Sequence, residues 1–577
     1  MRLHLTLTAA ALAIATAGCQ VADTANNQSA TVQSASDWPG FMQGFLDAGF
    51  KANPGFAVAQ GRHEYDGQIG DYSSAGINAE VARLQTAIAD AGAFPDDKLS
   101  KDQKFERAYL VAVAKGKLFW IDPAGADQPH TNPASYLGAL DPSVYITVPY
   151  AAKDVRLKAY TKFLQNVPRA AEQMRANIKP PMAASFVDYA KSAFGGFVTY
   201  YPGDGMAAWA GVGTPEDQAA LKAATDGAVA AMKTTVEWVE SQRAAAQPNF
   251  QLGAAKFQRM LADTEMVTTP IAELERIGRA DLAANQKLLT EACSRYATGA
   301  TIPDCMAKMN ANKPVGGAVA GARAQLAGLK QFIIDHDIVT IPGPEEAKVE
   351  EAPPYQRQNF AYINIPGPYE KGLPSVYYIA PPDPSWTKEV RDGFVPGEAD
   401  LLFTSVHEVW PGHFLNFLHS NRSPFLFGRV FVGYAFAEGW AHYSEEMMRV
   451  SGVGGGTDET MIGQLSNALL RNCRFLSAIG MHTGSMTQAQ SQAMFQQQCY
   501  QDEGSAKQQA ARGTYDPAYL NYTMGKLMIR KLRDDWVASR GGQKAWKAFH
   551  DQFLSYGGPP IPLVRQQMMG GDAKAVF

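Results

Sequence analysis

The chain has 577 residues, of which 46% are hydrophobic and 19% are charged, so it can bury a large core. This composition excludes an intrinsically disordered protein. The formal net charge is −4, and a chain without a basic excess is not expected to bind the phosphate backbone of a nucleic acid.

The N-terminus is predicted to be an export signal. Arg2 precedes an apolar stretch over residues 5–15 that is too short to span a bilayer. Residues 16–19 read TAGC, and small residues before a cysteine are typical of a bacterial lipoprotein signal. We therefore expect a signal peptide over residues 1–18 and a lipid on Cys19; the alternative is an ordinary cleaved signal with an incidental cysteine.

The predicted location follows from this signal. Residues 19–37 are rich in Ser, Thr, Asn and Gln and are expected to form a flexible tether. The protein is expected to be exported and lipid-anchored, in the outer membrane of a Gram-negative bacterium and facing the periplasm. Contact with the membrane is expected only through the N-terminal lipid, and the oligomeric state is left open.

Residues 38–577 are expected to form one mainly α-helical domain with three parts. Residues 38–338 form a helical part, in which Thr214-Pro215-Glu216-Asp217 predicts a capped helix start and residues 269–274 predict another. Residues 339–396 are rich in Pro and Gly and hold two short predicted strands, and residues 397–577 are helical again, with a Gly/Pro-rich tail from Gly557.

The four cysteines after Cys19 are an even number, as expected in an oxidising compartment. Among the three possible connectivities, we predict the local pairs Cys293–Cys305 and Cys473–Cys499. The alternative is four reduced, buried thiols. No CxxC occurs, so a cysteine-ligated zinc is not expected.

The two predicted strands cover residues 360–364 and 375–379. In many zinc peptidases, a short strand beside the metal helix pairs its edge with the substrate backbone. On this interpretation Tyr377 and Tyr378 are candidate substrate-binding residues. The alternative is a hairpin that only packs against the core.

Residues 405–413, with the sequence SVHEVWPGH, hold the first candidate metal ligands. A catalytic zinc needs about three protein ligands and one open position, and two histidines at i and i+4 share a helix face. Here the second histidine, His413, is six residues after His407, about 240° around an ideal helix. Pro411 and Gly412 lie between them, and we expect a distortion at this pair to bring the two imidazoles together.

A third ligand is expected from Glu438, twenty-five residues after His413, at the start of a second helix. Its helical neighbour His442 is a further ligand, a partner of a ligand or a substrate contact. Glu408 is expected to be the general base that takes a proton from zinc-bound water. Glu445 and Glu446 are expected to form an exposed acidic turn.

Residues 407–413 resemble the HExxPGH motif of the bacterial DUF885 family, and residues 438–443 resemble its EGWAxY motif. Residues 54–66, 269–278, 474–482 and 522–525 are similar to further stretches of that family, so the resemblance covers nearly the whole mature chain. It implies a mainly α-helical fold, akin to the large helical zinc oligopeptidases, with His407, His413 and Glu438 as ligands of Zn²⁺ and Glu408 as the base.

The resemblance also implies accessory residues. It brings His482 and Tyr522 toward the site, where each is expected to donate a hydrogen bond to an oxyanion. Arg474 is expected to hold a substrate carboxylate. For these three residues, core hydrogen bonding or surface charge is the alternative. Where the family has an aspartate before the glycine of its DxGxH segment, this chain has Ala478.

The resulting hypothesis is a zinc-dependent metallopeptidase that hydrolyses peptides or oligopeptides outside the cytoplasm. A different class remains open, namely a non-catalytic peptide-binding or scaffold lipoprotein with a metal-like pocket, and the Ala478 difference is its only motivation. A zinc amidase acting on cell-wall peptides would share the mechanism and differ only in substrate.

Overall fold

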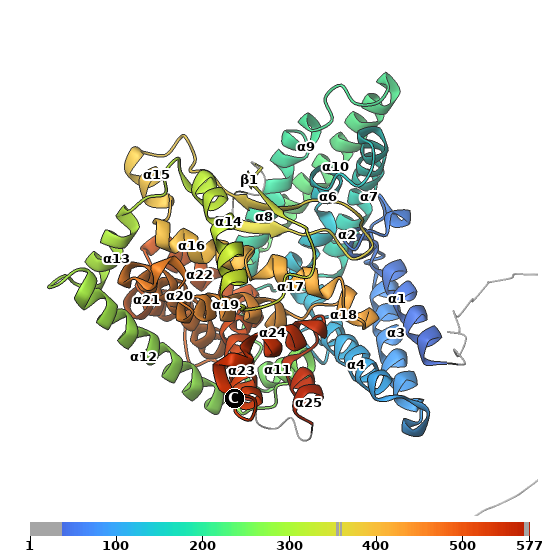
Figure 1. The fold of residues 1–577 in the computed structure, drawn as a ribbon. Helices are drawn as coiled ribbons and strands as arrows, with labels where there is room; N and C mark the ends of the chain where they lie inside the picture. Colours follow the sequence, from blue (N-terminus) through green and yellow to red (C-terminus); the bar gives the residue numbers. More distant parts are fainter. Residues whose placement is uncertain (1–36, 354–356, 358–359, 571–575) are drawn as a thin grey trace, which may run out of the picture.

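A computed structural model describes residues 37–353, 357, 360–570 and 576–577 (Figure 1). The predicted signal peptide, the lipidated Cys19 and the tether, apart from Asp37, lie outside these residues. The fold is mainly α-helical with one small sheet, which confirms the predicted class. No helix in the described part of the chain combines the length and the apolar character needed to cross a membrane.

The N-terminal part is built entirely of helices, as the sequence predicts. They are α1 (Trp38–Ala52), α2 (Pro54–Ala59), α3 (Ser74–Ala93), α4 (Lys101–Ile121), α5 (Gln128–Thr131), α6 (Ser143–Thr147), α7 (Lys153–Asn177), α8 (Ala184–Tyr200), α9 (Asp204–Ala207), α10 (Pro215–Ser241), α11 (Ala254–Glu265), α12 (Ile271–Tyr296), α13 (Ile302–Ala311) and α14 (Ala318–Asp335).

Local sequence signals explain where these helices begin. The hydroxyl of Thr214 accepts a hydrogen bond from the backbone amide of Asp217, and the Asp217 side chain accepts one from the amide of Thr214. This reciprocal cap satisfies amides that an isolated helix start leaves unpaired. At α12 the predicted start is shifted slightly. The helix begins at Ile271, Pro270 precedes it, and no side chain caps it.

The sheet has three strands, β1 (Ala347–Glu351), β2 (Ala361–Asn364) and β3 (Ser375–Ile379), in the order β1-β3-β2. β3 pairs with β1 in parallel and with β2 in antiparallel orientation. The two predicted strands are confirmed, whereas β1 is not among the predictions. Because β3 is paired on both sides, its own edges are not available to a substrate backbone.

The chain returns to helix at Lys388, inside the segment predicted to hold strands, and the C-terminal part holds the motif residues. Its helices are α15 (Lys388–Phe394), α16 (Glu398–Glu408), α17 (His413–Ser420), α18 (Leu426–Val430), α19 (Tyr434–Val450), α20 (Asp458–Thr483), α21 (Gln488–Cys499), α22 (Glu503–Tyr515), α23 (Asn521–Val537), α24 (Trp546–Ser555) and α25 (Ile561–Met569). The prediction of a Gly/Pro-rich tail after the last helix is wrong in part, because α25 follows Pro560 as a regular helix with a buried apolar face.

Apolar side chains gather in a large cluster formed by the C-terminal helices together with α11–α14, and in two smaller clusters among the N-terminal helices. One of the smaller clusters, formed by α1, α3 and α4, includes Phe427 of α18 and Leu563 of α25. The two parts of the chain are thus joined by shared core. Both predicted disulfides are present, Cys293–Cys305 between α12 and α13 and Cys473–Cys499 between α20 and α21.

Candidate metal centre

The break between α16 and α17 brings the two histidines of the HEVWPGH stretch together. Instead of bulging within one helix, the chain ends α16 at Glu408 and begins α17 at His413. Gly412 is required here, because a Cβ on it would lie 1.8 Å from the carbonyl oxygen of His407. The backbone amide of Gly412 donates to the Val406 carbonyl, and the imidazole centroids of His407 and His413 end 4.8 Å apart.

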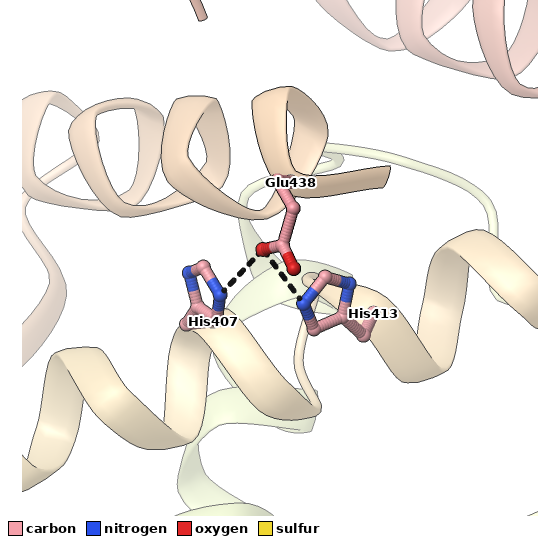
Figure 2. A group of neighbouring side chains, drawn as sticks. All are labelled: His407, His413 and Glu438. Atoms are coloured by element: carbon pink, nitrogen blue, oxygen red, sulfur yellow. Dashed lines mark ion pairs between the residues drawn. The ribbon is translucent and has the colours of Figure 1, made fainter. Parts of the chain in front are cut away.

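Glu438 of α19 completes the group. Its Oε2 lies 3.3 Å from Nε2 of His407 and 3.3 Å from Nε2 of His413, as Figure 2 shows. The three ligand atoms all lie within 4.8 Å of one another, and Glu438 Oε2 is buried without a hydrogen-bond partner. Two ligand atoms at about 2.0–2.1 Å from a tetrahedral zinc are separated by about 3.3–3.4 Å, so this donor set fits that ion.

Two further residues of the second motif explain how Glu438 is held. The indole nitrogen of Trp440 donates to the Pro411 carbonyl at 2.7 Å, which ties α19 to the break between the two histidines. Gly439 lies against Gly525 of α23, where a Cβ on Gly439 would be 2.5 Å from the Gly525 Cα. The close approach that only glycine allows therefore places Glu438 beside α23 and its residue Tyr522.

Glu445 is an essential part of the centre that the sequence interpretation missed. The predicted exposed acidic turn is wrong, because Glu445 is fully buried and accepts from Nδ1–H of His407 at 2.7 Å. This bond orients the imidazole so that its Nε2 faces Glu438 and His413. Arg471 of α20 lies 3.1 Å from the same carboxylate and balances its charge. Glu446 pairs instead with Lys526 and Arg530 of α23.

The charges of these residues follow from their neighbours. Burial raises the pKa of Glu445, but Arg471, His442 and His407 together hold it far below its usual value. Burial and Arg471 lower the pKa of His407, but its bonds to Glu438 and Glu445 raise it to about 9.

Glu408 lies at the end of α16 and lines the same cleft. Burial raises its pKa, while His407 and His413 act in the opposite direction, and the net shift is upward. Its carboxylate makes no ion pair with any residue in the described ranges. The cleft has a volume of about 1410 Å³ and is lined by residues of α6, α8, the sheet, α16, α17, α19, α20, α22 and α23.

Tyr522 and Arg474 lie in this cleft, as expected. The ring of Tyr522 stacks at 6.3 Å from that of His407 and lines the cleft. The guanidinium of Arg474 lies 4.9 Å from the centroid of the Tyr522 ring. Both side chains therefore line the cleft beside the metal-site residues.

Three other predicted site residues do not reach the cleft. His482 packs against Phe257, and its Nε2 bonds to the Gly513 carbonyl at 2.7 Å, so its predicted catalytic role does not fit. Burial lowers its pKa to about 4. His442 is fully buried and bonds through Nδ1 to Glu445 at 3.2 Å, so it supports that carboxylate instead of contacting substrate.

Tyr377 is the third of these residues. Neighbouring residues of a strand point to opposite faces, and in β3 this places Tyr377 in the apolar core and Tyr378 on the cleft side. The predicted substrate contact is thus wrong for Tyr377, whereas Tyr378 does line the cleft. The sheet edge that lies along the cleft is β2, from Ala361 to Asn364.

Comparison with known proteins agrees with this fold. A putative lipoprotein of unknown function from Shewanella oneidensis has a similar structure, with a TM-score of 0.77 at 23% identity over 93% of this chain and 100% of its own. A putative lipoprotein from Colwellia psychrerythraea gives a TM-score of 0.77 at 16% identity over 92% and 97% of the two chains. No curated protein matches the sequence. The model of a family described as bacterial protein of unknown function, DUF885, matches residues 54–568, and the chain therefore belongs to the DUF885 family.

Proposed function

We propose that the protein is a zinc-dependent metallopeptidase that hydrolyses peptides or oligopeptides outside the cytoplasm. The observation that supports this most directly is the convergence of His407, His413 and Glu438, with both histidine nitrogens 3.3 Å from one carboxylate oxygen. Two histidines and a glutamate leave one position of a tetrahedral ion free for water, as in known zinc peptidases.

The surrounding residues support the chemistry. Zinc bound to these three side chains would lower the pKa of a water molecule and polarise a peptide carbonyl. Glu408 would accept a proton from the attacking water and return it to the amine nitrogen as the carbon–nitrogen bond breaks, so that each bond cleaved would consume one water. Tyr522, whose ring lies 6.3 Å from that of His407, would donate a hydrogen bond to the carbonyl oxygen.

The test combines metal analysis with a peptide library. Purified protein is expected to hold one zinc per chain by elemental mass spectrometry and to cleave peptides, with products read by mass spectrometry. Glu408→Gln should keep its zinc and lose activity by about 10²- to 10⁴-fold, the usual contribution of a general base. Absence of zinc contradicts the mechanism, and cleavage that survives the substitution removes Glu408 from its role.

The same experiment separates the alternatives. A non-catalytic peptide-binding or scaffold lipoprotein would retain peptides from the library without cutting them. A cell-wall amidase would cut muropeptides and leave linear peptides intact. Neither alternative has an observation of its own in the described residues beyond the difference at Ala478.

We further propose that the protein is exported and anchored by a lipid on Cys19, in the outer membrane and facing the periplasm. The TAGC sequence and two disulfides suit this location, and both similar solved structures are of proteins named putative lipoproteins. Cys19→Ser should move the protein from the membrane fraction to the soluble periplasmic fraction. Retention of that variant in the membrane fraction contradicts the anchor.

A further inference from the structure

Positive charge gathers around Tyr522 in the wall of the cleft. Three guanidinium groups, from Arg471 and Arg474 of α20 and Arg512 of α22, surround the ring of Tyr522 at 5.7, 4.9 and 5.9 Å from its centroid. We call these three residues the arginine wall. Like charges held this close in a buried place need anions beside them.

Two of the three arginines have their anions inside the protein. Arg471 pairs with Glu445 at 3.1 Å, and Arg512 pairs with Asp516 at 2.9 Å. Arg474 is different: its Nε donates to the side-chain oxygen of Gln509 at 2.8 Å, and no carboxylate among the described residues lies within ion-pairing distance. Arg474 is only 8% exposed and lines the cleft, so a buried cation without a partner faces the space that a substrate would fill.

The distance from the metal centre limits what this cation can bind. The Tyr522 ring lies 6.3 Å from the His407 ring and 4.9 Å from the Arg474 guanidinium, so these two groups are at most about 11 Å apart. One peptide residue spans at most about 3.3–3.6 Å. After allowing for the metal–substrate distance and for the ion pair itself, one or two residues fit between the reacting carbonyl and Arg474.

The cleft is also bridged next to this wall. Tyr189 of α8 stacks on Tyr515 of α22, with ring centroids 3.9 Å apart, and both rings line the cleft beside Arg512. This pair joins the N-terminal helices to the C-terminal ones. A bridge at this place suits a peptide that ends at the arginine wall.

We propose that Arg474 binds the C-terminal carboxylate of the peptide, which makes the protein a carboxypeptidase that releases one or two residues from the C-terminus. The inference rests on the proposed peptidase function and names its substrate class. A carboxylate accepts two parallel hydrogen bonds from a guanidinium, and the pair would replace the anion that Arg474 lacks inside the protein. Arg471 and Arg512 keep their internal partners and add attraction without binding the ligand directly.

The experiment compares peptides of one sequence with a free C-terminus and with a C-terminal amide, using the zinc-loaded protein. The free acid should be cleaved with a kcat/KM about 10- to 100-fold higher, as expected for hydrogen bonds between charged groups. Mass spectrometry should show cuts one or two residues from the end. In Arg474→Met this preference should fall to within about 2-fold, mainly through a higher KM, and Arg474→Lys should restore part of it.

A matched control variant separates binding at Arg474 from a general electrostatic attraction by the positive charges of the cleft. Lys348 of β1 is an exposed cation that lines the same cleft, and Lys348→Met should leave the preference for the free acid unchanged. If the preference falls equally in both variants, or survives in Arg474→Met, the inference is wrong. Equal cleavage of acid and amide, or cuts spread over internal bonds, also overturns it. An amidated peptide ending in Glu that is preferred over one ending in Gln would assign Arg474 to a side chain instead.

A binding measurement distinguishes failure of this inference from failure of the peptidase proposal. Calorimetric titration of zinc-loaded Glu408→Gln with the acid and the amide measures carboxylate recognition without turnover. Preferential binding of the acid that is lost with Arg474→Met supports the carboxylate site even if no peptide is ever cut. Cleavage with no such preference in binding or turnover leaves the peptidase and removes the site.

Discussion

The metal centre and the part of the arginine wall around Arg474 differ in how the protein neutralises a buried arginine. Arg471 and Arg474 lie three residues apart on α20, and both reach the ring of Tyr522. Arg471 is locked to Glu445, which in turn orients His407. Arg474 has only the neutral side chain of Gln509. The arginine next to the metal-site residues is thus neutralised inside the protein, whereas Arg474, one turn further along the same helix, has no anion among the described residues.

The largest expected effect breaks the metal centre itself. His413→Ala removes one of three ligands and should weaken zinc binding by well over the ~100-fold typical of losing a supporting residue. Activity should disappear with the metal. The control is His419→Ala, on the same helix, whose Nε2 bonds to the Thr340 carbonyl outside the cleft. Zinc content measured on both purified variants decides the outcome, and a full zinc complement in His413→Ala contradicts the ligand assignment.

The next effect separates the two arginines by stability. Arg471→Met leaves the buried Glu445 with only its histidine partners and should cost about 3–5 kcal/mol, as for other broken buried ion pairs. Arg474→Met breaks no internal ion pair and should cost about 1 kcal/mol, the size of one hydrogen bond. Thermal unfolding followed by circular dichroism, in the presence of a chelator, compares them. Equal losses would show that Arg474 is as much a structural residue as Arg471.

Tyr522 borders both the metal centre and the arginine wall, and removing its hydroxyl tests to which of the two it contributes. If it donates to the developing oxyanion, Tyr522→Phe should lower kcat by about 10²- to 10³-fold, the usual effect of losing one such donor. Zinc content and the preference for a free C-terminus should stay as they are. A change confined to KM would place the hydroxyl with the arginine wall instead.

The smallest expected effect concerns the support of His407. Glu445→Gln should reduce zinc affinity by about 10- to 100-fold, because the Nδ1–H of the imidazole loses its carboxylate partner. Glu446→Gln is the matched control, since the adjacent carboxylate pairs with Lys526 and Arg530 away from the metal ligands. Competition with a chelator of known affinity measures both. Equal affinities in the two variants would contradict the orienting role of Glu445.

Much of the fold could be predicted because local signals dominate it. Thr214 and Asp217 cap a helix through their own side chains, and the aromatic and β-branched residues of β3 favour a strand wherever it lies. β1 could not be found in this way. Its sequence AKVEE carries charged residues at exposed positions, and only its pairing with β3 makes it a strand.

The metal-site residues were predictable from their types and from the Pro-Gly pair between the two histidines, because a break there offsets the unfavourable six-residue spacing. Two histidines around a Pro-Gly pair, with a glutamate one helix later, are enough to indicate His407, His413 and Glu438 as a group. The supporting residues were harder to predict, because membership of a motif does not say which side of a helix faces the cleft. His482 and Tyr377 face the core, while Glu445 looked like a solvated acid. Its place seven residues after Glu438, on the same helix face, was the available signal.

The contact between Gly439 and Gly525 has a consequence for how this site can change over time. With no side chain at the crossing of α19 and α23, the spacing between the carboxylate of Glu438 and the phenol of Tyr522 cannot be tuned by small steps, since any larger residue forces the two backbones apart. New substrate preferences in descendants of this chain must therefore arise along the rim of the cleft, while the central spacing is inherited unaltered.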